Sequence, residues 1–151
     1  MFVAVEDQHG GLARQLSLFG TGTWGSEFAG TGPYRRLVGT PVSRLHVASD
    51  TSAAHLDALG TRLTQRFPRN AALVPSPLVG TLSGVKAGRT VALAVNGRIA
   101  AVSVAYRNPG GGSVRFSELV GENAFRVGRN AIRVYVVSRD PAAPRLESLS
   151  S

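Results

Sequence analysis

The chain has 151 residues, which indicates a single domain long enough to bury a core of its own. It contains no cysteine, which excludes disulfide bonds, thiolate metal sites and cysteine nucleophiles. The net charge is +8, and Lys86 is the only lysine among the 17 basic residues; such a charge attracts phosphate, sulfate or anionic polymers. Because the arginines are spread from Arg14 to Arg145, we expect dispersed surface charge rather than a nucleic-acid groove, which would need arginines clustered with aromatic residues.

The longest apolar runs are far shorter than the ~20 residues that span a membrane, so no membrane insertion is expected. The first residues lack the basic region of a secretory signal and turn acidic at Glu6. Taken as complete, the chain is predicted to be cytoplasmic. Taken as a piece of a longer, membrane-anchored protein, it is predicted to be extracytoplasmic.

The first third of the chain predicts short strands around a glycine-dense segment. Residues 2–5 and 12–19 are apolar enough for two strands. Residues 20–39 are rich in glycine and hold the only tryptophan, Trp24. We interpret this stretch as an ordered loop that embellishes the domain and is anchored by Trp24. Residues 45–48 predict another short strand.

The only helix that the sequence predicts covers about residues 50–67. Asp50 or Ser52 can cap it, because their side-chain oxygens accept hydrogen bonds from the free N–H groups of the first turn. Four apolar residues recur on one helical face: Leu56, Leu59, Leu63 and Phe67. Pro68 ends the pattern. Residues 71–82, which contain two prolines, predict an edge strand or an extended crossing segment.

The strongest signal in the chain is a hairpin within residues 90–106. Apolar residues alternate on both sides of Asn96-Gly97, a pair that favours a type I′ turn because both residues tolerate a positive φ. Residues 109–113, which read Pro-Gly-Gly-Gly-Ser, predict a mobile loop. A short strand is expected to resume over residues 114–116.

The last strong strand is predicted over residues 131–138, after a tight turn in which Gly128 supplies a positive φ. Residues 140–151 are rich in proline, alanine and serine and predict a flexible tail. Residues 1–139 are therefore predicted to form a single, mostly β domain. Its fold class is an antiparallel β-sandwich or jelly roll with one α-helix.

No motif in the sequence indicates a catalytic site, a metal site or a cofactor. Residues 20–25 match G-x-G-x-x-G, but the glycines and proline that follow do not allow the helix that a dinucleotide site requires. The three histidines, His9, His46 and His55, lack the spacing of zinc ligands.

Glu118 and Glu122 can be interpreted as a carboxylate pair for glycoside chemistry. Two carboxylates four residues apart are more often solvated surface groups, and we expect that here. A small hydrolase would need a pocket that gathers His46, His55 and a carboxylate. The sequence therefore favours a non-catalytic chain.

Aromatic and arginine side chains are the candidates for a ligand site. Aromatic rings can stack on a sugar ring, and arginines can bind its sulfate or carboxylate groups. Nothing in the spacing places the aromatic residues on one face, so packing in the core is the alternative. The predicted ligand-binding residues are Trp24, Tyr34, Arg98, Tyr106, Arg107, Arg129, Arg133 and Tyr135.

Three segments, NGRIAAVSVAYR, RFSELV and ENAFRVGRNAIRVYVV, resemble the C-terminal region of membrane-anchored, sulfatase-like hydrolases of GC-rich bacteria. In that family an NGRIAA hairpin leads to FS-LVP and a closing RPGRN-IEVY strand. PYRRLVGTPVSRL is similar to the segment that follows the family's catalytic domain, so the resemblance covers about residues 33–137. The closing pattern is also similar to sugar-binding jelly rolls that accompany many glycosidases. The family has proline where this chain has Gly121 and Val127.

The resemblance implies an accessory domain without its enzyme. The family's catalytic residue is a cysteine or serine in a C/S-x-P-x-R motif, modified to formylglycine beside metal-binding aspartates, and this chain has neither cysteine nor that motif. The predicted function is a non-catalytic accessory or binding module for a partner protein or an anionic glycan. A basic nucleic-acid-binding domain is the alternative, and a small hydrolase is a further one.

Overall fold

The computed structural model describes residues 34–67, 76–140 and 142–150. The strands within them are β1 (Val47–Leu56), β2 (Ser76–Ser83), β3 (Thr90–Val95), β4 (Arg98–Val104), β5 (Val114–Val120), β6 (Ile132–Val137) and β7 (Leu146–Ser150). One α-helix, α3 (Ala58–Gln65), and three 3-10 turns, η1 (Arg35–Leu37), η2 (Val42–Arg44) and η3 (Glu122–Ala124), complete the described elements. The predictions for residues 2–5 and 12–19, for Trp24 and for most of residues 20–39 lie outside these ranges.

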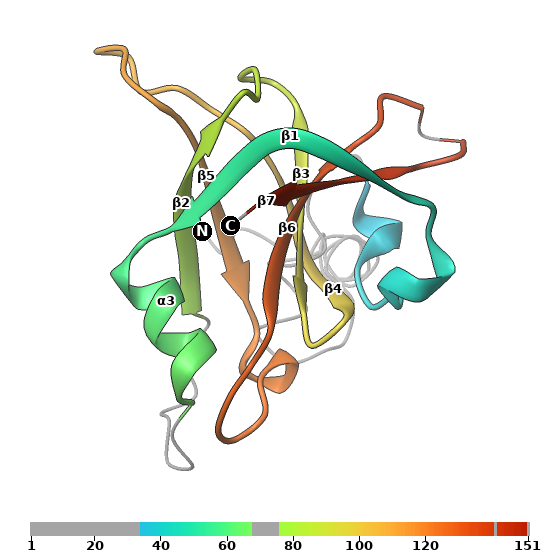
Figure 1. Cartoon of the computed structure of the whole chain (residues 1–151), viewed down its shortest axis with the longest axis vertical. Helices are drawn as coiled ribbons and strands as arrows, with labels where there is room; N and C mark the ends of the chain where they lie inside the picture. Colours follow the sequence, from blue (N-terminus) through green and yellow to red (C-terminus); the bar gives the residue numbers. More distant parts are fainter. Residues whose placement is uncertain (1–33, 68–75, 141, 151) are drawn as a thin grey trace, which may run out of the picture.

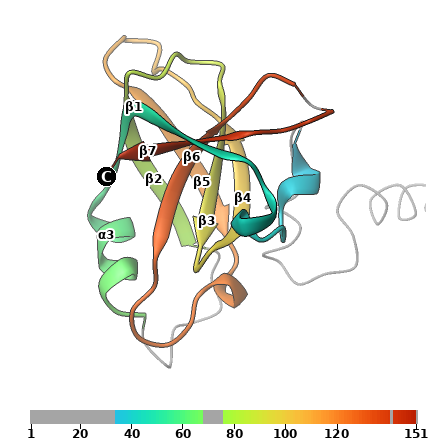
Figure 2. The same ribbon diagram turned by 45° about the vertical axis from the view of Figure 1, so that its right-hand side comes forward.

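The described strands form one mixed sheet in the order β4-β3-β6-β7-β1-β2-β5. All neighbours are antiparallel except β1 and β7, which run parallel. Figures 1 and 2 show the sheet curling until it is nearly a closed barrel, with α3 below β1 and β2. The predicted fold class, mostly β and sandwich-like with one helix, is confirmed.

The two outermost strands of the sheet, β4 and β5, meet and close most of the barrel. Just beyond the end of β4, Tyr106 pairs with Arg115 through two backbone hydrogen bonds of 2.9 and 2.8 Å. Further along the seam, the Ser103 hydroxyl donates to Oε1 of Glu118 at 3.0 Å. These contacts bring the two edges of the sheet together.

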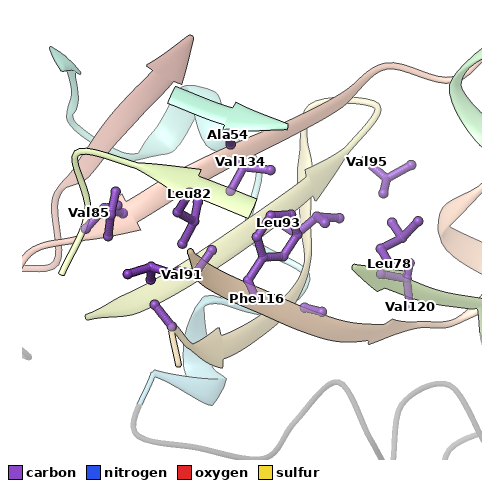
Figure 3. Packing of buried hydrophobic residues seen from close by; sticks show 14 of the residues in the cluster. Ala54, Leu78, Leu82, Val85, Val91, Leu93, Val95, Phe116, Val120 and Val134 are labelled. Atoms are coloured by element: carbon purple, nitrogen blue, oxygen red, sulfur yellow. The ribbon is translucent and has the colours of Figure 1, made fainter. Parts of the chain in front are cut away.

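Apolar residues pack on both faces of the sheet. The cluster inside the barrel takes residues from β1 to β6, among them the fully buried Phe116, Leu78 and Leu93, as Figure 3 shows. A second cluster lies on the outer face of β3, β4, β6 and β7, where Tyr34 and Leu37 cover it. Because β3 contributes to both clusters, all residues from Val91 to Val95 are buried.

The predicted hairpin is confirmed as β3 and β4. Asn96 has φ 51° and Gly97 has φ 79°, so both turn residues adopt the positive φ that a type I′ turn requires. The predicted glycine-rich loop lies between β4 and β5, and the strand predicted over residues 114–116 extends to Val120. The strand predicted over residues 131–138 is β6.

The tight turn predicted before β6 is also confirmed, since Gly128 has φ 94°. Asn130, which is 5% exposed, holds this turn with four hydrogen bonds. Its Oδ1 accepts from Asn96 Nδ2 and from the Arg126 N–H, both at 2.8 Å. Its Nδ2 donates to the carbonyls of Arg126 at 2.9 Å and of Gly128 at 3.1 Å. The side chain therefore links the β3–β4 turn to the start of β6.

Replacing Asn130 by alanine should lower the free energy of unfolding by roughly 2 kcal/mol. The substitution leaves buried donors and acceptors without a partner, and each such group costs about 1 kcal/mol or more. Urea unfolding followed by circular dichroism measures the change. Asn108→Ala, at an exposed residue between β4 and β5, should change stability by less than ~0.5 kcal/mol. Equal losses in the two variants would contradict the role given to Asn130.

The prediction of a helix over residues 50–67 was wrong for the first half of this range. Residues up to Leu56 belong to β1, and α3 begins only at Ala58. The helix cap is Asp57, whose Oδ1 accepts from the Gly60 N–H at 3.1 Å. Phe67 lies beyond the helix and stacks on Phe125 at a centroid distance of 5.0 Å. Pairing of β1 with β2 and β7 outweighs the helical spacing of the leucines.

Two further predictions were wrong for the same reason. Residues 71–82 were expected to form an edge strand or an extended crossing segment, whereas the described part, from Ser76 on, is β2, which lies between β1 and β5. Residues 140–151 were expected to form a flexible tail, whereas β7 lies inside the sheet between β6 and β1, with Leu146 fully buried. In both cases the partners are distant in sequence, so the local composition does not indicate the pairing.

Candidate functional site

The sheet splits where β7 ends. Among the described residues, β7 pairs with β6 at Tyr135, Val136 and Val137, and the last such pair with β1 joins Ala53 to Ser150. Both neighbours continue further: β6 extends back to Ile132 and β1 extends on to Leu56. Among the described residues, the stretches of β6 and β1 beyond these pairs flank an opening in the barrel wall.

A cleft of about 710 Å³ occupies this opening, and we call it the β1–β6 cleft. Its lining residues come from the end of β1, the start of β6, the end of β7 and α3: Ala54, His55, Leu56, Thr61, Ile132, Arg133, Val134, Ser148, Leu149 and Ser150. Strands that are distant in sequence thus form one site.

The β1–β6 cleft has an apolar inner side and a cationic outer side. Ala54 and Val134, both labelled in Figure 3, belong to the cluster inside the barrel, and Leu56, Ile132 and Leu149 pack against it. His55 and Arg133 are exposed and alternate with these residues along β1 and β6. Alternation along a strand places them on the opposite face.

The charged group in the cleft is a cation. Its described lining residues include the guanidinium of Arg133, with the His55 imidazole as a further polar group, and no carboxylate. A second cleft, of about 460 Å³, shares His55 and is lined by Lys86 and Arg107, again without a carboxylate among its described lining residues. The arrangement suits an anionic ligand with an apolar part, held by hydroxyls and charge-assisted hydrogen bonds.

The structure separates most of the predicted ligand-binding residues. Tyr34 and Tyr135 are 6% and 3% exposed and pack in the outer cluster, where the Tyr34 hydroxyl donates to the Ser138 carbonyl at 2.8 Å. Tyr106 is 38% exposed, and Trp24 lies outside the described residues. The described tyrosines therefore form no stacking platform.

The four predicted arginines lie at separate places. Arg98, at the β3–β4 turn, donates to the Gly39 carbonyl. Arg107, after β4, donates to the Gly112 carbonyl and lines the second cleft. Arg129 is exposed in the turn before β6, and Arg133 lines the β1–β6 cleft. His55 was not among the predicted ligand-binding residues, and its position on β1 depends on the strand that the helical pattern concealed.

Glu118 is a buried carboxyl rather than the solvated surface group that was expected. It is 3% exposed and faces the barrel interior from β5, and its Oε2 has no hydrogen-bond partner among the described residues. Burial raises the pKa of Glu118 to about 8, and the hydrogen bond from Ser103 offsets this rise only in part. The sequence contained the signal, since Glu118 shares its parity with Val114, Phe116 and Val120.

No metal site forms in the described part of the chain, and the β1–β6 cleft does not gather the residues that a small hydrolase would need. No group of three or more histidine, aspartate or glutamate side chains in that part of the chain could hold a metal ion. The small-hydrolase alternative required His46, His55 and a carboxylate in one pocket, and only His55 lines the β1–β6 cleft.

Residues 34–67, 76–140 and 142–150 include no helix long and apolar enough to cross a membrane. Searches against protein-family models, curated proteins and solved structures found no match to this chain.

Proposed function

We propose that this chain is a non-catalytic binding module and that its ligand is anionic. The two ligand classes compatible with this proposal are an acidic segment of a partner protein and an anionic glycan. The observation that carries it is the β1–β6 cleft, where Arg133 and His55 lie beside an apolar side and no described lining residue carries a carboxylate. The accessory role that the resemblance implies agrees with this proposal.

Nucleic-acid binding is the less favoured function. The side chains of Arg98 and Arg107 donate hydrogen bonds to nearby backbone carbonyls, and Arg129 lies at another turn, so these three arginines do not form one basic groove. Of the described tyrosines, only Tyr106 is exposed enough to stack on a base. Binding of single strands normally combines a basic groove with several stacking aromatic residues.

Replacing Arg133 by glutamine should weaken binding of an anionic probe by about tenfold at physiological salt, because one charge-assisted hydrogen bond is lost. Suitable probes are a glutamate oligopeptide and a sulfated oligosaccharide, each titrated against the labelled protein by NMR. The chemical-shift changes should centre on the residues that line the β1–β6 cleft.

The matched control is Arg44→Gln, which removes the same charge from an exposed position in η2 outside the cleft. It should weaken binding by less than about twofold. Equal weakening by the two variants would show that binding depends on the overall positive charge of the chain and not on the cleft, and would refute the proposed site.

A further inference from the structure

We infer that the second cleft, together with the outer face of β2 and β5 beside it, binds a sulfated glycan. This inference rests on the proposed function and chooses the glycan from its two ligand classes. A sulfated glycan presents oxyanions, sugar rings and hydroxyls, so its site needs cations, an exposed aromatic ring and hydroxyl groups. The described residues of this surface supply all three.

A row of four side chains crosses the outer face of the sheet here. His55 of β1 pairs with Thr81 of β2, and Thr81 pairs with Arg115 of β5. Arg115 pairs in turn with Tyr106, just beyond β4. Next to each of the four, a residue of the same segment belongs to the cluster inside the barrel, so the four side chains point outward. Directly opposite side chains lie about 5 Å apart, which gives a row of about 15 Å.

The second cleft adjoins this row, since His55 and Thr81 also line it. Lys86 of the β2–β3 loop and Arg107 of the β4–β5 loop bring positive charge into the cleft, and these two loops lie at the same end of the barrel (Figures 1 and 2). The lining residues with a hydroxyl group are Thr81, Ser83 and Ser113. The cleft therefore offers both cations and hydroxyl donors to an anion.

The arginines of this surface are available to a ligand. Arg107 donates to the Gly112 carbonyl, and a guanidinium has five N–H donors, so most of them remain for a ligand. Neither Arg107 nor Arg115 forms an ion pair with a described residue. Lys86 also lines a neighbouring cleft that contains two carboxylates. Arg107 and Arg115 are therefore the main cations of the proposed site.

The exposed groups favour a sugar over an acidic peptide. The apolar lining residues Leu82, Val85 and Val114 are buried in the inner cluster, so the cleft exposes mainly hydroxyls and cations. Peptides usually bind to an apolar groove or a free sheet edge, and β2 is paired on both sides. Tyr106 is 38% exposed and can stack on a sugar ring. Serine and threonine hydroxyls both donate to and accept from sugar hydroxyls.

His55 connects this surface to the β1–β6 cleft, because it lines both clefts. One glycan chain can therefore extend from Arg133 past His55 and along the row to Tyr106. A sulfate ester has three terminal oxygens and a carboxylate has two, so a sulfate can accept from a guanidinium and from hydroxyls at the same time. This difference favours a sulfated glycan over one that carries only carboxylates.

The test uses the full chain and a chondroitin sulfate tetrasaccharide, titrated by NMR. The comparison ligand is the unsulfated tetrasaccharide of the same backbone, which keeps the carboxylates and should bind about tenfold more weakly. For the sulfated ligand, Arg107→Gln should weaken binding by about tenfold and Tyr106→Ala by about fivefold. High salt should reduce the effect of Arg107→Gln and leave that of Tyr106→Ala. The control Arg44→Gln, in η2 outside this surface, should weaken binding by less than about twofold.

Unchanged binding of the sulfated tetrasaccharide to both Arg107→Gln and Tyr106→Ala would overturn this inference. If that binding still depended on Arg133, the proposed function would stand. The same conclusion would follow if a glutamate or phosphoserine peptide bound in an Arg133-dependent manner and no sulfated glycan bound. Dependence on Arg107 and Tyr106 but not on Arg133 would support the inference and place the ligand on this surface alone. If no anionic probe depends on any of the three residues, the proposed function fails together with the inference.

Discussion

Replacing Gly80 by alanine should lower the free energy of unfolding by about 3 kcal/mol, near the upper end for overpacked sites. Gly80 lies in β2 between Leu56 of β1 and Phe116 of β5. An added Cβ would overlap the His55 carbonyl oxygen and would lie 2.6 and 2.7 Å from two carbons of the Phe116 ring. The carbonyl belongs to a paired strand and the ring is fully buried, so neither can move without loss of packing or pairing.

Chemical denaturation of the variant measures this loss. Gly110→Ala is the matched control, because a Cβ there would meet nothing within 4 Å, and its stability should change by less than ~0.5 kcal/mol. Combining Gly80→Ala with Phe116→Leu should recover only part of the loss, since the overlap with His55 remains. A loss below ~1 kcal/mol for Gly80→Ala would contradict the packing described for β2.

The stability of the protein should fall as the pH rises from about 4.5 to about 8, and Glu118→Gln should remove this fall. Burial raises the pKa of Glu118 from 4.5 to about 8, so between these values the folded state holds a proton that the unfolded state has released. The unfolded state then binds fewer protons, and the free energy of unfolding decreases by roughly 1.4 kcal/mol per pH unit. Below about pH 4.5 both states are protonated and the penalty disappears.

Urea unfolding at a series of pH values, for the wild type and Glu118→Gln, isolates this contribution. Glu122→Gln serves as the control and should keep the slope, because Glu122 is not buried in the barrel. Hydrogen bonds from Ser52 and Thr51 lower the pKa of the Asp50 carboxyl below 3.8. Any effect of Asp50 on stability therefore falls below the pH range in which Glu118 is tested. Parallel curves for the wild type and Glu118→Gln would show that Glu118 does not titrate in this range.

The sequence alone determined the elements whose conformation depends on neighbours in the chain. Asn96 and Gly97 tolerate a positive φ, so their turn and the hairpin around it follow from local preference. The turn at Gly128 and the alternation along β6 have the same origin. These signals were sufficient to predict the mostly β fold class.

The tertiary structure alone decided the elements whose partners are distant in sequence. β1 is a strand because β2 and β7 pair with it, although its residues also fit a helical pattern. β7 is part of the sheet because β6 and β1 bury Leu146. No propensity of a short proline-, alanine- and serine-rich segment indicates such pairing.

The candidate site follows the same division. Arg133 was selected from the sequence, but its association with His55 depends on β7 ending between β6 and β1. Glu118 shares the buried parity of β5, but its hydrogen bond with Ser103 depends on β5 closing against β4, which no local pattern encodes. The sequence determined local backbone geometry, where the energy depends on adjacent residues. The tertiary structure decided strand partners and the cleft, where the energy comes from contacts between residues far apart in the chain.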